Sequence, residues 1–313
     1  MSKKISIILT RTLGDVMLIH NLVDGVYKKY PCALEIDVYV DEMYKDIVQG
    51  NEKINKIFTS PRWLSNWKYI LQMVAGDDYN EVLIPQQVTT EDALWHQMDY
   101  LRHQHLVDYY LERCRLPKRD LGDAVQLYVS NEDIDKVDQL LIEKNITNYI
   151  VIHSTSGVPT KDWNYFSELV SILTEKEITI VQVGAVTDKL VSCSSNDYFC
   201  DERGKLTFSQ IGALCKKADC FVGLDSGISY ISASAKIPTI VLQGSTIPET
   251  SGPWGDNVIN VLSKTLPSCE SLRCHANCRY ISEVPGGKCI NLIKVNDVLN
   301  VVKEFTYDKK EKI

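Results

Sequence analysis

Short apolar runs rich in β-branched residues recur along the chain, separated by segments in which apolar residues return every three or four positions. The runs predict buried strands, and the longer periodicity predicts amphipathic helices. Strands are expected at residues 5–9, 34–40, 82–84, 149–153, 178–183, 221–224 and 239–242. Helices are expected at residues 19–27, 89–115, 137–144, 166–173 and 208–217, between the last two strands, and after Asn296 as a cap. This alternation is typical of βαβ units in parallel sheets.

Both halves of the chain begin with the same unit of strand, polar loop and helix. The first half opens with the strand at 5–9 and the loop Thr10–Asp15, and the second with the strand at 149–153 and the loop Ser154–Trp163. A chain of 313 residues corresponds to about two domains of ~150 residues each. We expect an N-terminal domain of residues 1–146 and a C-terminal domain of residues 147–313.

Composition places the chain among ordinary globular proteins. Hydrophobic residues make up 44% and charged residues 24%, and no run approaches the ~20 apolar residues of a membrane span. The first residues lead directly into a strand pattern, so no signal peptide is expected and we expect a cytoplasmic protein. A net charge of −7 gives no overall basic footprint for nucleic acid. Without an export signal, the ten cysteines are expected to be thiols or metal ligands rather than disulfides.

Three polar loops follow predicted strands, and the carboxyl ends of parallel strands meet at the edge of a sheet where ligands bind. They contain Gly14-Asp15, then Ser154, Ser156 and Lys161, then Asp225-Ser226-Gly227. Small residues at a helix start leave backbone N–H groups free to bind phosphate, and the helix dipole favours an anion there. Lys161 adds a mobile positive charge. Asp-Ser-Gly is also a common turn and helix cap, so the loops alone do not identify a ligand.

The order of three longer stretches identifies a family. They read TRTLGDVMLIHNLVDGVYKKYP, VIHSTSGVPTKDWNYFSELVSIL and GKLTFSQIGALCKKADCFVGLDSGISYISASAKIPTIVLQGSTIPETSGPWG. Together they resemble glycosyltransferase family 9, the ADP-heptose:lipopolysaccharide heptosyltransferases and their relatives. The resemblance implies the α/β GT-B fold, with two Rossmann-like domains whose parallel sheets face a central cleft. It implies an acceptor-side N-terminal domain and a nucleotide-sugar-binding C-terminal domain with a terminal helix.

The resemblance also implies roles for individual residues. Asp15 matches the candidate general base near the acceptor, although an acid at a helix start can also serve only the helix dipole. Lys161 and Ser156 would contact the donor diphosphate, with Asp225 beside the sugar or phosphate. Asp188 is a candidate ribose partner, and Leu206 would lie against the adenine. The implied donor-binding set is Gly14, Ser154, Ser156, Lys161, Asp188, Leu206, Asp225, Ser226, Gly227 and Tyr230.

The implied activity is inverting transfer of a sugar, heptose-like or other, from a nucleotide-sugar donor, ADP-linked, to an acceptor hydroxyl, with no cofactor required for catalysis. The acceptor could belong to a glycan, a protein or another polymer, including a modified nucleobase. Many relatives carry His where this chain has Tyr230, and a tyrosine brings no positive charge. A degenerate nucleotide-sugar-binding or assembly protein therefore stays an alternative. A GT-B-like sugar-nucleotide epimerase would need carboxylates at both sides of its cleft, and the sequence nominates only one.

Four cysteines lie close together in one predicted loop, at Cys269, Cys274, Cys278 and Cys289. Four thiolates could form a structural zinc or iron site, and free thiols or a disulfide are the alternatives. The other six, such as Cys215 and Cys220, are expected to be small core residues. His96, His103 and His105 share a predicted helix without a metal-binding arrangement, so we expect surface or packing roles.

Overall fold

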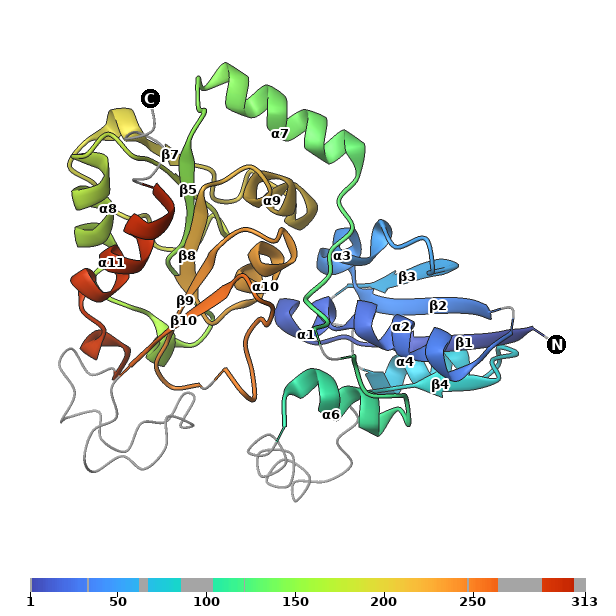
Figure 1. The fold of residues 1–313 in the computed structure, drawn as a ribbon. Coiled ribbons are helices and arrows are strands. Elements are labelled where there is room, and N and C mark those ends of the chain that lie inside the picture. Colours follow the sequence, from blue (N-terminus) through green and yellow to red (C-terminus); the bar gives the residue numbers. More distant parts are fainter. Residues whose placement is uncertain are drawn as a thin grey trace. The chain divides into compact units, whose positions relative to one another are not determined.

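The computed structural model describes residues 2–32, 34–61, 67–85, 104–120, 122–246, 248–263 and 289–306. The chain forms two compact units, Met1–Tyr128 with Glu249–Ser251, and Val129–Pro248 with Gly252–Ile313. Each unit contains one parallel sheet with helices on its faces (Figure 1). This is the two-domain α/β architecture expected from the alternation of strand and helix patterns.

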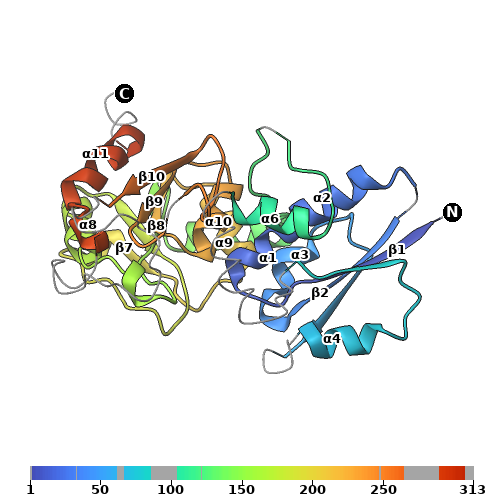
Figure 2. The same ribbon diagram turned by 90° about the horizontal axis from the view of Figure 1, so that it is seen from below.

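Unit 1 is built on a four-stranded sheet in the order β3-β2-β1-β4, with every pair parallel. The strands are β1 (Lys3–Ile8), β2 (Leu34–Asp41), β3 (Lys56–Ser60) and β4 (Glu81–Leu83), and the helices are α1 (Leu13–Met17), α2 (Ile19–Lys29), α3 (Lys45–Gln49), α4 (Trp67–Val74) and α6 (Leu106–Arg113). Figure 2 shows α4 on the opposite side of this sheet from α2 and α6. Ile70 and Val74 of α4 pack on Ile8 and Tyr39 of the strands.

Unit 2 is built on a six-stranded parallel sheet in the order β10-β9-β8-β5-β6-β7. The strands are β5 (Tyr149–His153), β6 (Thr179–Gln182), β7 (Phe199–Asp201), β8 (Cys220–Leu224), β9 (Thr239–Gln243) and β10 (Val258–Leu262), and the helices are α7 (Asn131–Glu143), α8 (Phe166–Thr174), α9 (Phe208–Cys215), α10 (Gly227–Ser234) and α11 (Val295–Thr306). Residues of α8 and α11 share one apolar core with alternate residues of the central strands. In Figure 1, α9 and α10 lie on the other face of the sheet.

The order of the strands in unit 2 creates a topological switch point. From β5 the chain moves outward through β6 to β7, then returns to place β8 on the opposite side of β5. Loops that leave the carboxyl ends of β5 and β8 must therefore diverge, and open α/β sheets bind ligands in the crevice this leaves. The two diverging loops are the ones that contain Lys161 and Asp225-Ser226-Gly227.

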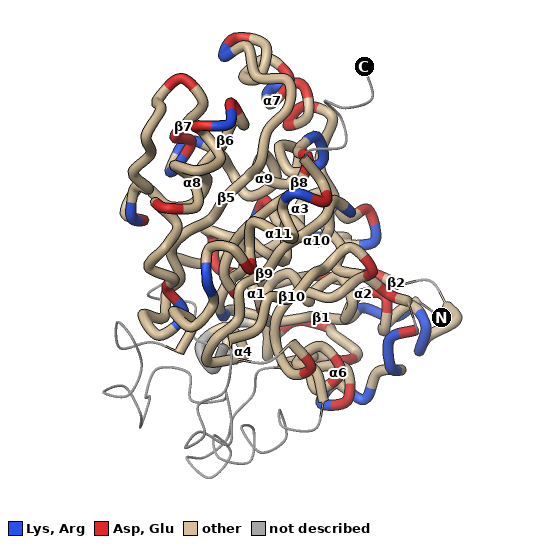
Figure 3. Tube along the Cα trace, turned by 60° about the vertical axis from the view of Figure 1, so that its left-hand side comes forward, with Lys and Arg blue, Asp and Glu red and all other residues tan. Residues whose placement is uncertain are grey.

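Unit 2 begins at Val129, which is earlier than the expected boundary between residues 146 and 147. Helix α7 belongs to unit 2, because it packs on α9 and the Ser209 hydroxyl donates to the Asp133 carboxylate at 2.7 Å. Figure 3 shows charges of both signs along α7. One exposed ion pair on this helix joins Lys136 to Glu132. The sequence pattern does not show to which domain an amphipathic helix belongs when it lies between the strands of two sheets in the sequence. The surface on which the helix packs determines this.

Several local expectations need correction. Gly14 and Asp15 lie inside α1 rather than in a loop, because Thr12 starts a helix there. Asn296 lies in the first turn of α11, which begins at Val295, so it is not the cap. Strands β3, β7 and β10 were not expected, because they are short edge or near-edge strands with little full burial. Within the described ranges, every helix is too short or too polar to cross a membrane.

Candidate functional site

Asp15 in unit 1 is held by hydrogen bonds to both of its carboxylate oxygens. Thr12 donates its backbone N–H at 3.2 Å and its hydroxyl at 2.6 Å to Oδ2. Tyr110 of α6 donates its hydroxyl to Oδ1 at 2.5 Å. The Arg11 Nε atom lies 3.9 Å from Oδ2. Asp15 is only 7% exposed, so two nearby donors from Thr12 and one sequence-distant donor from Tyr110 orient a nearly buried carboxylate.

Three hydrogen-bond donors use most of the accepting capacity of the Asp15 carboxylate. Burial, followed by the Asp15 charge, raises the pKa of Tyr110 well above its ordinary value, so its hydroxyl stays protonated and donates. A carboxylate has about four lone-pair positions, and these three donors use three of them. The hydrogen bond that the Thr12 N–H donates to the Asp15 carboxylate also caps the start of α1. Asp15 therefore has a structural role, and its role as a base stays a prediction.

Lys161 and Asp225 form an ion pair that joins the two loops at the switch point of unit 2. The Lys161 Nζ atom lies 2.7 Å from Asp225 Oδ2 and 3.3 Å from the Asp225 carbonyl oxygen. Thr246, just after β9, donates its hydroxyl to the same Oδ2 at 2.5 Å. The Lys161 and Asp225 side chains are 13% and 6% exposed. A cation held at the carboxyl edge of a parallel sheet, next to a helix start, is suited to an incoming phosphate.

The serines in the loop after β5 are engaged in shaping that loop. The Ser154 hydroxyl accepts from Gln182 Nε2 at 3.0 Å and donates to the Lys189 carbonyl at 3.3 Å. The Ser156 hydroxyl donates to the Val158 carbonyl at 2.6 Å and accepts from its N–H. Both serines belong to the same connection between β5 and α8 as Lys161. Their contact with a nucleotide-sugar donor stays a prediction.

Ser226 lies in the turn between β8 and α10, where its hydroxyl meets the His153 ring. The Ser226 Oγ atom is 3.1 Å from His153 Nδ1, and His153 Nε2 is 3.3 Å from Asp188 Oδ2. Gly227 is the first residue of α10, and its φ lies outside the left-handed region. Ser226 and Gly227 therefore place the start of a helix beside the Lys161–Asp225 pair.

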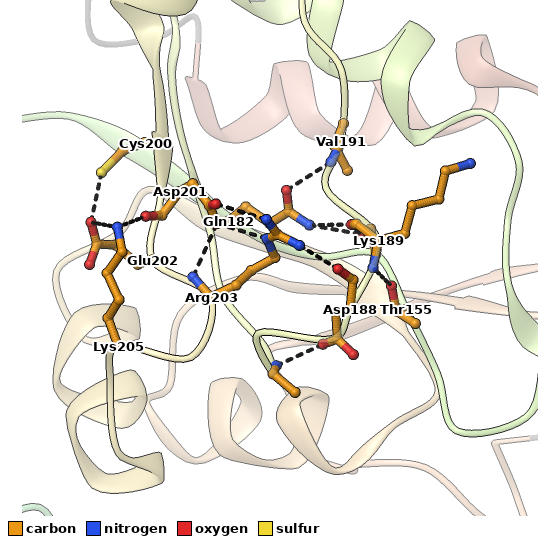
Figure 4. Close-up of polar contacts among 12 residues, drawn as sticks. Thr155, Gln182, Asp188, Lys189, Val191, Cys200, Asp201, Glu202, Arg203 and Lys205 are labelled. Atoms are coloured by element: carbon orange, nitrogen blue, oxygen red, sulfur yellow. Dashed lines mark hydrogen bonds and ion pairs between the residues drawn. The ribbon is translucent and has the colours of Figure 1, made fainter.

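Asp188 is part of a polar network at the edge of β6 and β7 (Figure 4). The Arg203 guanidinium pairs with Asp201 at 2.8 Å and donates to the Asp188 carbonyl. Burial opposes ionisation of Asp188, but hydrogen bonds from His153 and the Ala185 N–H lower its pKa below the ordinary value. Leu206 lies partly exposed in the turn between β7 and α9. The structure thus places the two predicted nucleoside contacts near the ends of β6 and β7.

Tyr230 is a buried residue of α10 that anchors the segment after residue 251. Its hydroxyl accepts the Gly252 N–H at 2.9 Å, and its ring meets Trp254 edge to face at 6.2 Å. Gly252 has φ +105, and a Cβ there would lie 2.9 Å from Gln243 Nε2, so only glycine fits well. Tyr230 holds this glycine-containing turn over the donor loops, and any direct contact with donor stays a prediction.

The predicted cysteine cluster falls mostly outside the described residues. Cys269, Cys274 and Cys278 lie there, and Cys289 starts a short 3₁₀ helix. Among the residues that the structure describes, no group of three or more His, Cys, Asp or Glu could hold a metal. Cys114, Cys215 and Cys220 are buried as expected, whereas Cys32 is exposed and Cys193 and Cys200 are partly exposed.

Of the three predicted histidines, one lies among the described residues. His96 and His103 lie outside them, and His105 caps α6 by accepting the Val107 N–H at 3.3 Å. A separate cavity of about 290 Å³ in unit 1 is lined by β4 and the end of α6, including Lys29, Glu81 and Arg113. None of the predicted site residues lines this cavity.

Three residues of the site were missed by sequence reasoning. Tyr110 lies 95 positions from Asp15, and no local pattern connects them. His153 ends a predicted strand, and its position at a carboxyl edge was a usable signal. Thr246 follows β9 at the same edge, so the rule that identified the other three loops would also have identified this one.

Residues 100–279 match the sequence model of glycosyltransferase family 9 (heptosyltransferase), which is more than half of the chain. Lipopolysaccharide heptosyltransferase 3 of Escherichia coli is 28% identical over 326 residues, which cover 88% of this chain and 94% of that protein.

Two solved structures share the fold. The family 9 glycosyltransferase of Veillonella parvula superposes with a TM-score of 0.75 at 16% identity, covering 98% of both chains. The E. coli ADP-heptose lipopolysaccharide heptosyltransferase II superposes with a TM-score of 0.69 at 14% identity, covering 98% of this chain and 99% of that one. The expected GT-B fold, with two parallel-sheet α/β domains, is thereby confirmed.

Proposed function

The chain belongs to glycosyltransferase family 9, and from this premise we propose that it transfers a heptose-like sugar from an ADP-linked donor to an acceptor hydroxyl with inversion. Glycosyltransferase activity is a property of the family. The ADP donor and a glycan acceptor of lipopolysaccharide type are our proposal, supported by the names of the similar E. coli proteins.

The observation that carries the donor site is the position of Lys161. Its ammonium lies at the switch point of unit 2, in contact with the Asp225 turn that starts α10. The first-turn N–H groups of α10 and the Lys161 charge would both face a diphosphate, which is where negative charge accumulates as the donor bond breaks. Asp188 and Leu206, near the ends of β6 and β7, would contact the ribose and the adenine.

Asp15 would act as the general base. Its carboxylate takes the proton of the acceptor hydroxyl while the acceptor oxygen bonds to the anomeric carbon. The bond from that carbon to the donor phosphate breaks, and its electron pair leaves on the diphosphate, stabilised by Lys161. The Thr12 and Tyr110 donors hold the carboxylate in one orientation, so little reorganisation is needed at reaction.

Asp15→Asn tests this assignment, because asparagine keeps an acceptor oxygen for Tyr110 but cannot take the proton. Removing a general base typically lowers the rate by about 10²–10⁴-fold. We expect a loss of kcat of that size with ADP-heptose and a glycan acceptor, and an ADP affinity within a few-fold of wild type. Near-normal turnover by the folded variant would exclude Asp15 as the base.

Wild-type binding and turnover separate the proposal from its alternative. ADP binding without hydrolysis or transfer of any ADP-sugar would favour the degenerate binding protein, for which Tyr230 in place of histidine is the sequence argument. Calorimetry with ADP, UDP and GDP identifies the base of the donor independently of turnover.

The cysteine cluster is proposed as a structural metal site. Cys269, Cys274, Cys278 and Cys289 are close enough in sequence to supply four thiolates to zinc or iron. Such a metal would stabilise the segment that precedes α11 and would take no part in transfer.

A further inference from the structure

His153, Ser226 and Asp188 form a hydrogen-bonded chain at the switch point of unit 2. They come from the end of β5, the turn after β8 and the loop after β6, which are the elements that border the crevice. His153 is 6% exposed, so its ring has little access to water other than through these neighbours. The direction of each hydrogen bond in the chain can be derived from the chemistry of the groups.

An ionised carboxylate accepts hydrogen bonds and never donates them. The pKa of Asp188 lies below its ordinary value, despite burial, because of the hydrogen bonds that it accepts. His153 Nε2 therefore carries a hydrogen and donates it to Asp188. When the imidazole is neutral, the other nitrogen is an acceptor, and His153 Nδ1 then accepts the Ser226 O–H.

This direction conflicts with a contact between Ser226 and a phosphate. A serine hydroxyl has one hydrogen, and a hydroxyl that donates it to His153 presents only lone pairs to other groups. Phosphate oxygens are acceptors, so the two sets of lone pairs would repel. A proton on His153 Nδ1 reverses the bond, because the imidazolium then donates to Ser226 Oγ and frees the O–H to donate to the diphosphate.

We propose that binding of a nucleoside diphosphate is coupled to uptake of one proton by His153, which turns the Ser226 hydroxyl toward the ligand. The proton comes from solvent and bonds to Nδ1, and no covalent bond of the ligand changes. His153 is thus a positioning residue that acts through Ser226. The inference rests on the proposed function, in which the diphosphate binds at the turn after β8.

The charged groups around the ring favour this assignment. The Asp188 carboxylate lies 3.3 Å from His153 Nε2, and Arg203 behind it is paired with Asp201. Lys161 and Asp225, on the side of Ser226, form an ion pair with each other. Gly184 has φ +137, and a Cβ there would overlap the Asp188 carboxylate and lie 3.0 Å from His153 Cδ2. A glycine at this point permits the close contact between ring and carboxylate.

Titration calorimetry with ADP in several buffers of different ionisation enthalpy counts the protons directly. At a pH near 8, an ordinary histidine is neutral and the ADP phosphates are fully ionised. We expect wild type to take up about one proton per ADP there, and its ADP affinity to fall by up to about tenfold per pH unit. Adenosine, which lacks the diphosphate, is the matched control ligand and should bind without proton uptake.

Two variants locate the proton. His153→Gln should bind ADP more weakly and without proton uptake, and Ser226→Ala should reduce the uptake because the hydroxyl that links ring and ligand is gone. Binding of ADP by wild type without net proton uptake would overturn this inference and leave the proposed donor site intact. Full proton uptake by folded His153→Gln would do the same. Failure of wild type to bind any nucleoside diphosphate would overturn the proposed donor site and the inference together.

Discussion

In both candidate centres, at Asp15 and at Lys161, individual hydrogen bonds orient charged side chains. Tyr110 and Asp15 are the clearest case, because the Tyr110 hydroxyl is buried and lies 2.5 Å from the carboxylate. A net hydrogen bond to a charged group contributes about 1.5–3 kcal/mol. Its loss at the proposed general base should affect turnover more than donor binding, since all the proposed donor residues except Gly14 lie in unit 2.

Tyr110→Phe is therefore expected to lower kcat by about tenfold or more while the donor KM stays within a few-fold. Tyr149→Phe is a matched control, because it removes a buried hydroxyl that donates to the Leu214 carbonyl at 2.7 Å. The control should reduce thermal stability and leave kcat unchanged. Steady-state kinetics on both variants decides, and equal kcat losses would mean that Tyr110 contributes only stability.

Lys161→Ala removes the cation at the switch point and leaves the Asp225 carboxylate with the Thr246 hydroxyl as its side-chain partner among the described residues. Loss of a charge-assisted contact costs about 1.5–3 kcal/mol, which corresponds to an ADP affinity lower by about 10- to 150-fold. Lys144→Ala serves as the control, since Lys144 also pairs with a buried acid, Glu202, at 3.2 Å. ADP affinity measured by calorimetry should fall only for Lys161→Ala, and unchanged affinity would remove Lys161 from the donor site.

At the scale of elements, the start of α10 decides whether a phosphate can approach. The Cα–Cβ bonds of a helix tilt toward its N-terminus, so a side chain at Gly227 would project over the first-turn N–H groups. The backbone of Gly227 is not in the left-handed region, so a larger residue there is blocked by the ligand rather than by its own φ.

Gly227→Val should accordingly weaken ADP binding far more than Ser226→Ala, which keeps the backbone amide and loses only a hydroxyl. Gly76→Val, at a glycine of unit 1 with open space around it, controls for the general effect of valine. A folded Gly227→Val protein that binds ADP as tightly as wild type in calorimetry would show that the turn is only a helix cap.

The proposed functions divide between the two units. Unit 2 holds the residues proposed for the donor except Gly14, and unit 1 holds Gly14 and Asp15 with the hydrogen-bond donors of Asp15. Residues 249–251 return to unit 1, where the Thr250 carbonyl accepts the Leu106 N–H at 3.0 Å. The chain therefore crosses between units more than once, and a boundary placed at one point in the sequence is incomplete.

A structural metal would affect the whole chain through the segment before α11. We expect the purified protein to contain about one zinc or iron per chain by elemental analysis, since four thiolates complete a tetrahedral site. Cys274→Ser should lower that content and the melting temperature. In metal-free protein that is denatured but not reduced, titration of ten thiols would indicate free cysteines, and eight would indicate a disulfide.

Sequence alone determined the features that depend on local physics. Periodicity located the βαβ units, and β5 was predicted at its observed bounds, because a buried strand must be a continuous apolar run. The carboxyl-edge rule selected the loops of Lys161 and Asp225, since parallel strands present their ends together. Edge strands such as β3 and β10 escaped prediction because partial burial leaves no strong apolar pattern.

Tertiary structure alone decided which side chains meet. The partnership of Asp15 with Tyr110, the reversal of strand order between β5 and β8, and the packing of α7 on α9 join segments far apart in sequence. The same holds for His153, which reads in sequence as the end of a strand and in the structure as the link between Ser226 and Asp188. Hydrogen bonds act over about 3 Å, so their partners are fixed by packing, and packing depends on the whole chain at once.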